Sequence, residues 1–438
     1  MDAPVRSTGP AFGRRSFLTA AAAAGLGAAG LAGCGAGEPD AATVRYWSLL
    51  SGGDGALMDE IIAEVRTQGI DLEPVVLAWG APYYTKLAMA STGGRAPELA
   101  VLHLSRLAGY APGGLLDPWD MDVLADLGVT EDDFPPAVWE RAQIDGERFA
   151  IPLDTHPFVL FYNTEHCEQA GLLEPDGTLT EISSFDDWLA AGTELQQVAG
   201  GHGISYGYVN DGAQMWRLFA TFYFQHGAEM TLRPGEPSGI DRDVAGDSLD
   251  AMKRMLDGTV ANPDADYLAG LAEFTGGRSG FFCSGVWELR GMQAAGLPVD
   301  GTVIPTLFGT PATYADSHSY VLPHQDSPDP ARRQATHEAV AAILKDSLRW
   351  AEAGHIPAYQ PIVDSPEYAE LTPQAHYAVA ADQVVLDPEA WFTGSGSEFQ
   401  TRVGQAMQTT LNGGASVQQA LADVEAEVQR LLDQPNPA

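Results

Sequence analysis

The sequence predicts an α/β protein built from two domains. Runs typical of strands alternate with runs typical of amphipathic helices near the start of the folded part: strands at 43–47, 72–79 and 98–104, and helices at 56–65 and 83–91. This alternation indicates a parallel sheet covered by helices. The chain of 438 residues is too long for one typical core. Proline and glycine are spread along it without a single linker, as expected of a chain that passes between domains more than once.

The later elements follow from the same patterns. Two extended runs, 149–153 and 157–162, flank Asp154-Thr155-His156; the first is expected to close domain one and the second to open domain two. We expect further strands at 204–209, 302–307 and 319–322, and helices at 185–198, 213–226, 246–257, 286–295, 335–352, 398–411 and 416–432. Ser184 and Ser416 stand where helix caps are expected.

The charge balance restricts the partners. The formal net charge is −36, from 23 basic and 59 acidic residues. Such a surface repels phosphates, so nucleic acid is not an expected partner. The long-range field also disfavours anionic ligands, although a local arginine could still capture one.

The N-terminus predicts export. Arg14 and Arg15 precede a short, weakly apolar run of mostly alanine and glycine, which is too short for a membrane span of ~20 residues. The run ends in LAGC at 31–34 and resembles a twin-arginine lipoprotein signal, in which the cysteine is lipidated. We therefore expect a signal peptide at 1–33, a lipid anchor on Cys34 at the outer face of the cell membrane, and a linker at 34–42. The alternative is a plain cleaved signal in which Cys34 is incidental.

Two cysteines remain in the exported protein. Cys167 and Cys283 could form one disulfide outside the cytoplasm, but the twin-arginine route carries chains that are already folded, which argues against an essential bridge. Neither cysteine belongs to a C-x-x-C pair, so the sequence predicts no metal site at them.

Ordered landmarks along the mature chain resemble one family. The most specific is GERFAIP at 146–152 followed by LFYN at 160–163; the others lie at 44–48, 84–87, 94–99, 114–118, 170–172, 184–188, 281–288 and 354–358. Together they resemble the extracellular solute-binding proteins of bacterial ABC importers, in the maltose-binding-protein-like group that takes up sugars and oligosaccharides.

The resemblance implies an α/β, two-lobed periplasmic-binding-protein-like fold, each lobe a mostly parallel sheet flanked by helices, with a multi-strand hinge. Lobe 1 would comprise 43–154 plus about 303–354, and lobe 2 about 155–302 plus about 355–438. It also implies a monomer that binds a carbohydrate in the cleft without catalysis or cofactor, and that delivers it to an ABC permease powered by a cytoplasmic ATPase.

Candidate ligand contacts follow from the rule that open α/β sheets bind ligands beyond the carboxyl ends of their strands. Flat aromatic rings suit the C–H faces of a sugar, and polar side chains suit its hydroxyl groups. The residues at these positions are Ser48, Trp79, Tyr83, His103, Asp154, His156, Asn210, Trp216, Trp287, Glu288, His318 and Tyr320. Trp216 also fits a second interpretation, because it belongs to an aromatic stripe typical of a helix core.

Three alternatives remain open at this stage. His103, His156 and His318 could ligate a metal from three loops, but no pair has the spacing of a known metal motif, so we expect no metal ion. The same fold could bind a polyamine, a peptide or a phosphate ester. A secreted glycosidase would need two carboxylates at a fixed separation, and the many acidic residues leave that possible.

Overall fold

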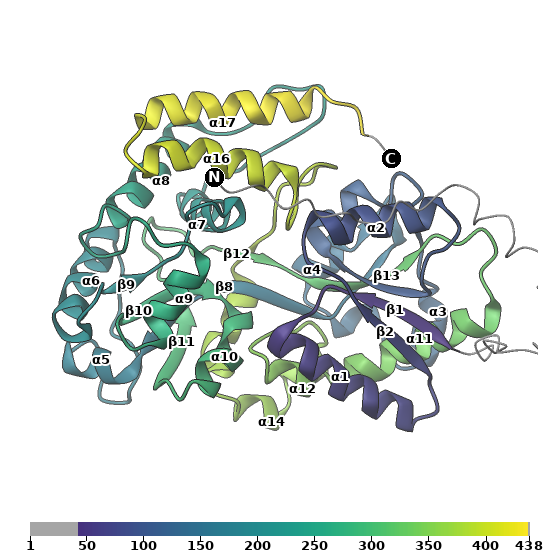
Figure 1. Ribbon diagram of the computed structural model, residues 1–438. Helices are drawn as coiled ribbons and strands as arrows, with labels where there is room; N and C mark the ends of the chain where they lie inside the picture. The colour runs from purple at the N-terminus through teal and green to yellow at the C-terminus, as the bar shows by residue number, and fades with distance from the viewer. Residues whose placement is uncertain (1–42, 437–438) are drawn as a thin grey trace, which may run out of the picture. The chain divides into compact units, whose positions relative to one another are not determined.

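Two mixed β-sheets organise residues 43–436, the part of the chain that the computed structural model describes (Figure 1). The predicted signal with Arg14 and Arg15, and the whole linker 34–42 with Cys34, lie outside these residues. Among the described residues, none of the helices has the length and apolar character needed to cross a bilayer.

The first sheet confirms the expected strand–helix alternation. β1 pairs in parallel with β2 and β3, while β13 runs antiparallel to β3, β4 and β7. Its strands are β1 (Val44–Ser48), β2 (Leu72–Val76), β3 (Leu99–His103), β4 (Leu116–Asp117), β7 (Ala150–Pro152) and β13 (His318–Pro323). The helices of this part are α1 (Gly52–Thr67), α2 (Ala81–Thr92), α3 (Met121–Asp126), α4 (Pro136–Arg141), α11 (Pro330–Lys345) and α12 (Ser347–Ala351). A hairpin of β5 (Gln143–Ile144) and β6 (Glu147–Arg148) leads into β7.

The second sheet is organised around β8 (Asp154–Asn163), in which every residue is buried. β8 runs antiparallel to four strands: β10 (Phe281–Gly285), β11 (Val299–Val303), β12 (Thr313–Asp316) and β14 (Ile356–Pro357). Only β9 (Ile204–Ser205) and β15 (Val384–Val385) pair in parallel, with β10 and β12 respectively. The sheets are therefore mixed rather than mostly parallel, because single long strands receive neighbours from several returning segments.

Helices of the second part surround this sheet and include a C-terminal pair. They are α5 (Thr164–Gln169), α6 (Phe185–Ala199), α7 (Gly212–Gln225), α8 (Arg242–Met255), α9 (Tyr267–Thr275), α10 (Leu289–Ala294), α13 (Gln360–Val363), α14 (Pro366–Ala369), α15 (Gln374–Tyr377), α16 (Glu398–Leu411) and α17 (Val417–Leu432). α16 packs on α7 and α17 on α8, at the top of Figure 1. The caps predicted at Ser184 and Ser416 are confirmed, since both hydroxyls accept a backbone N–H of the first turn.

Some predicted boundaries are wrong. The helix expected at 335–352 begins at Pro330, because the Asp329 carboxylate caps it, and ends at Lys345 before the separate helix α12. The strand expected at 204–209 has only two residues. Asp154, Thr155 and His156 are not a connection between two runs but the first residues of β8.

Between residues 43 and 436, the chain passes between the two sheets three times. It leaves the first sheet after β7 and enters β8 at Asp154, returns at Ser317 between β12 and β13, and passes back between α12 and β14. The second passage was expected near 303, but β11 and β12 both pair with β8, so the segment before Asp316 belongs to the second sheet. Cys167 and Cys283 are separate, buried thiols and form no disulfide.

Candidate functional site

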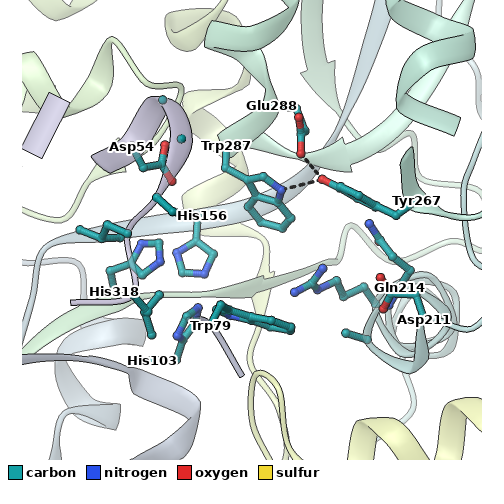
Figure 2. Close-up of a pocket in the computed structure, with 17 residues that line it drawn as sticks. Asp54, Trp79, His103, His156, Asp211, Gln214, Tyr267, Trp287, Glu288 and His318 are labelled. Atoms are coloured by element: carbon teal, nitrogen blue, oxygen red, sulfur yellow. Dashed lines mark hydrogen bonds between the residues drawn. The ribbon is translucent and has the colours of Figure 1, made fainter. Parts of the chain in front are cut away.

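A pocket of about 480 Å³ lies where elements of both sheets meet (Figure 2). The first sheet contributes Trp79 after β2, His103 at the end of β3 and His318 at the start of β13. The second contributes His156 on β8 and Trp287 in η3 (Val286–Glu288), the turn that follows β10. The volume is in the range of small-molecule sites.

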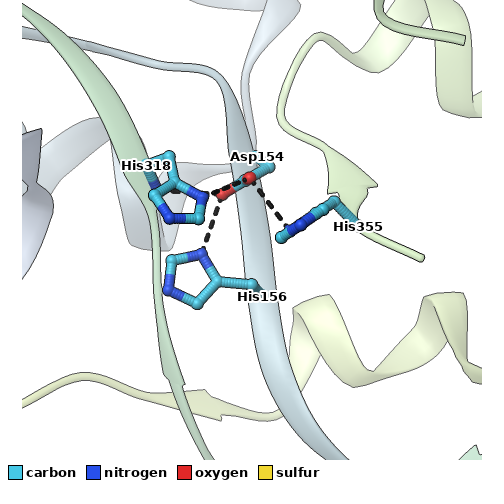
Figure 3. A group of neighbouring side chains, drawn as sticks. All are labelled: Asp154, His156, His318 and His355. Atoms are coloured by element: carbon cyan, nitrogen blue, oxygen red, sulfur yellow. Dashed lines mark hydrogen bonds and ion pairs between the residues drawn. The ribbon is translucent and has the colours of Figure 1, made fainter. Parts of the chain in front are cut away.

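The Asp154 carboxylate holds two of the pocket imidazoles in place (Figure 3). Nδ1 of His156 lies 3.0 Å from Oδ1, and Nδ1 of His318 lies 2.8 Å from Oδ2. The backbone N–H of His318 and the indole N–H of Trp350 also donate to this carboxylate, each at 2.8 Å. Because an ionised carboxylate only accepts hydrogen bonds, both imidazoles present Nδ1–H to Asp154 and direct Nε2 elsewhere.

A third imidazole completes the cluster around Asp154. Nδ1 of His355 lies 3.1 Å from Asp154 Oδ2, and its Nε2 lies 3.2 Å from Oδ2 of Asp54. Burial alone would lower the pKa of His355, but the two carboxylates raise it to about 10, so this imidazole is protonated. Burial would raise the pKa of Asp154, but the surrounding histidines hold it well below its usual range. The cluster is thus a buried ion pair.

Two of the imidazoles that line the pocket, those of His156 and His103, are neutral because their pKa values are lowered. Burial, reinforced by neighbouring His318, lowers the pKa of His156 to about 3. The same two causes hold the pKa of His103 well below its usual range. With the proton of His156 on Nδ1, its Nε2 carries a lone pair on the pocket side. This nitrogen can accept a hydrogen bond from a hydroxyl group.

Trp287 is held in place by a short relay of polar groups (Figure 2). Its indole N–H donates to the Tyr267 hydroxyl at 2.9 Å, and that hydroxyl donates to the carboxylate of Glu288. Burial raises the pKa of Glu288. The indole ring lies directly over Gly285, where an added Cβ would come within 1.9 Å of the ring. Glycine at 285 is therefore needed for this position of Trp287.

The N-terminal end of α7 forms another wall. The Asp211 carboxylate caps the helix by accepting the backbone N–H of Gln214 at 3.0 Å. Gln214 and Arg217, three residues apart on one face of the helix, line the pocket. Gly212 and Gly404 let α16 approach this end closely, since a Cβ at Gly404 would lie 2.3 Å from Cα of Gly212.

Two sets of side chains bring potential metal-ligand atoms within 4.8 Å of one another: Asp154, His156, His318 and His355, and His103, His156 and Asp316. In the first set Asp154 already accepts from the imidazoles. In the second, Asp316 accepts the backbone N–H groups of Ser105 and Ser317 at 3.1 and 2.9 Å. Hydrogen bonds account for both arrangements without a metal ion.

Comparison with known proteins decides the family. Residues 66–376, more than half of the chain, match the model of the bacterial extracellular solute-binding proteins. The chain belongs to this family. No curated protein matches the sequence of this solute-binding protein.

Solved structures agree with the two-lobed fold. The GacH receptor of Streptomyces glaucescens, solved unliganded and with acarbose, has 17% identity and a TM-score of 0.75 over 90% of this chain and 98% of its own. The protein Lmo0181 of Listeria monocytogenes, in complex with cycloalternan, has 18% identity and a TM-score of 0.73 over 90% and 99%. UgpB of Mycobacterium tuberculosis, in complex with glycerophosphocholine, has 17% identity and a TM-score of 0.74 over 89% and 98%. At these identities the likeness establishes the periplasmic-binding-protein-like fold alone.

The solute-binding protein brings part of the predicted residue set together. The pocket is lined by Trp79, His103, His156, Trp287, Glu288 and His318. Asn210 lies next to it, in a second hollow of about 630 Å³ that Trp79 also borders. Trp79 is 45% exposed, which is unusual for a large apolar side chain and suits a surface that receives a ligand.

Five predicted contacts lie outside the pocket lining: Ser48, Tyr83, Asp154, Trp216 and Tyr320. Tyr83 donates to the carbonyl of Val101 at 2.5 Å within the first core, and Tyr320 packs against Tyr46 there. Trp216 is buried and donates to the Asp387 carboxylate, as the core interpretation of its helix implies.

The other two are buried for different reasons. Ser48 still belongs to β1, and residues 49–54, which form the loop after β1 and the start of α1, line the pocket instead. Asp154 acts behind the imidazoles rather than at the surface of the pocket. Because these five side chains do not line the pocket, they are not among the ligand contacts that we propose.

Sequence reasoning missed other lining residues, among them Asp54, Asp211, Gln214, Arg217 and Tyr267. A signal existed for one of them. Arg217 is the only Asp, Glu, Lys or Arg within 213–226, a run otherwise rich in aromatic residues. A lone charge within a helix that is otherwise mostly core indicates a group kept for a purpose other than packing.

Proposed function

We propose that this solute-binding protein captures a sugar or oligosaccharide in the pocket between its two sheets and delivers it to the permease of an ABC importer. The observation that carries the proposal is the presence of Trp79 and Trp287, which follow strands of different sheets, in one pocket beside imidazole groups (Figure 2). Indole faces pack on the C–H faces of sugar rings, while a ring nitrogen such as Nε2 of His156 accepts from hydroxyl groups.

The structural neighbours support this ligand class. Two of them were solved with bound acarbose and cycloalternan, both of which are carbohydrates. Polyamines and peptides have no counterpart among the neighbours described above. We propose that the protein releases its ligand unchanged.

The location of the protein is part of the same proposal. Export directed by Arg14 and Arg15 and lipidation of Cys34 would keep a monomeric binding protein at the outer face of the cell membrane. A receptor held there by a short linker meets its permease at a high effective concentration.

Thermal unfolding of the purified protein with a panel of mono- and oligosaccharides tests the proposal. A ligand present at 100 times its Kd adds about 2.7 kcal/mol to the free energy of unfolding and raises the melting temperature. The bound sugar should be recovered intact by chromatography. Stabilisation by spermidine or a peptide, with no response to any carbohydrate or polyol, would contradict the ligand class, and turnover of the sugar would contradict the absence of catalysis.

A further inference from the structure

Among residues 43–436, Arg217 is the one arginine or lysine that lines the pocket, and its guanidinium contacts only the aromatic rings of Trp287 and Phe158. Its guanidinium forms no hydrogen bond or ion pair with any residue between 43 and 436, and its Nε is buried without an acceptor. The group lies 5.0 Å from the centroid of the Trp287 ring, which holds it at the pocket wall.

The acidic groups of the pocket do not neutralise Arg217, because each has a different partner. Asp54 faces the protonated imidazole of His355 at 3.2 Å. Asp211 accepts the backbone N–H at the start of α7. Glu288 accepts the hydroxyl of Tyr267.

A guanidinium that is partly desolvated and left unpaired is costly. Its planar fork of N–H donors fits the two oxygens of a carboxylate or phosphate better than it fits a single hydroxyl group. The missing acceptor at Arg217 is therefore a group that the ligand can supply.

We propose that the pocket takes a polyhydroxylated solute that carries a carboxylate or phosphate group, such as a sugar acid or a sugar or polyol phosphate, with the anion at Arg217. This inference rests on the proposed function and narrows its ligand class. The imidazoles of His156 and His318 bind the hydroxyl groups, and Trp287 packs on the apolar face next to the anion.

The polarity of the pocket orients the ligand. The lone pair on Nε2 of neutral His156 repels an anion and accepts a hydrogen bond from a hydroxyl group. The charged end of the ligand is therefore directed away from His156. The formal charge of −36 on the chain opposes any anion at long range. Recognition of an anion by this protein consequently depends on the local contact with Arg217.

The experiment measures Kd by calorimetry for matched ligands: glucose, glucuronate and glucose 6-phosphate; galactose and galacturonate; glycerol and glycerol 3-phosphate; and maltotriose with digalacturonate. An acidic member is expected to bind at least about tenfold more tightly than its neutral counterpart. The carboxylate and phosphate members distinguish the two sources of the anion. Acetate and inorganic phosphate test whether the hydroxyl groups are needed.

Variants assign the preference to Arg217. Arg217→Met should raise the Kd of the acidic ligand about 10- to 100-fold and that of its neutral counterpart by a much smaller factor. Arg217→Lys keeps the charge but loses the fork, so an increase of about tenfold or less is expected. It also serves as the test if Arg217→Met does not fold. Arg278→Met is the matched control, because this exposed arginine likewise has no side-chain partner and lies outside the pocket lining.

Two results would overturn the inference while the proposed function stands: neutral sugars that bind as tightly as acidic ones, or an Arg217 variant that raises both Kd values equally. Binding of acetate or inorganic phosphate as tightly as the sugar acids would overturn the role given to the hydroxyl groups. Absence of binding by every neutral and acidic member would overturn both the inference and the proposed function.

Discussion

Replacing Asp154 with asparagine removes the charge on which the three passages between the sheets converge. Asp154 begins β8, His318 begins β13, and His355 precedes β14, so one carboxylate connects all three segments (Figure 3). The asparagine side chain has nearly the same shape but offers one acceptor oxygen and an NH₂ donor. That donor would face groups that are themselves donors.

The magnitude follows from the contacts that are lost. The protonated imidazole of His355 would keep only Asp54 as its counter-ion, and breaking a buried ion pair costs about 3–5 kcal/mol. The indole N–H of Trp350 and the Nδ1–H groups of His156 and His318 would compete for the one remaining oxygen. These hydrogen bonds belong to the same network, so their losses do not add independently. We expect Asp154→Asn to lower the free energy of unfolding by about 3–5 kcal/mol.

Chemical denaturation of the wild type and the variant at pH 7 measures this difference. Asp186→Asn is the matched control, because it removes a carboxylate whose ion pair with Arg254 at 2.9 Å is exposed on both sides. Such a pair contributes about 1 kcal/mol or less. A loss for Asp154→Asn no larger than that of the control would refute the assignment of Asp154 as the charged centre of the hinge.

Three further predictions concern pH and the pocket wall. The pKa of His355 in the folded protein is raised to about 10, so the stability that its protonation contributes is complete below its unfolded pKa of about 6.5 and is lost as the pH rises through about 10. The pKa of His156 is lowered to about 3, so the stability that this neutral imidazole contributes is complete above about 6.5 and is lost as the pH falls towards 3. Denaturation at several pH values should therefore show a maximum between these limits, and His355→Gln should flatten chiefly the alkaline side. Trp79→Ala should weaken sugar binding about tenfold with an unchanged melting temperature, because the ring is 45% exposed; a cooperative loss of folding would show that the ring is part of a core. Gly285→Ala, at a backbone φ of −75° that alanine adopts readily, should displace the Trp287 ring and weaken binding as Trp287→Ala does, and unchanged affinity would remove Trp287 from the site.

The elements of the fold were readable from the sequence because they depend on local patterns. Strand–helix alternation predicted the parallel core of β1, β2 and β3, and capping serines predicted the starts of α6 and α17. The mixed character of the sheets was not readable in the same way. The antiparallel partners of β8 arrive from distant segments, and no local pattern specifies to which sheet a short strand such as β12 belongs.

Some of the side chains predicted to contact a ligand line the pocket, and others do not. Trp79 and Trp287 lie shortly after strands and within two residues of a glycine, so position alone indicated rings outside the sheets. Tyr83 and Trp216 begin or occupy helices, where the helical phase decides between core and pocket. That phase depends on how α2 and α7 pack. For Arg217, by contrast, the sequence did contain a signal. It is the one Asp, Glu, Lys or Arg in the run 213–226, which is otherwise rich in aromatic residues, and it lies on the side of α7 that faces the pocket.

The connection between the hinge and the pocket required three-dimensional information for a specific reason. His156 is two residues from Asp154 and on the same strand, so their contact has a local origin. His318 lies 164 positions away and meets the same carboxylate only because β13 and β8 run through adjacent passages between the sheets. One pair of carboxylate oxygens therefore orients imidazoles that line the pocket and also binds the segments about which the sheets would move. A ligand that contacts His156 and His318 therefore acts on side chains that are anchored at the hinge itself.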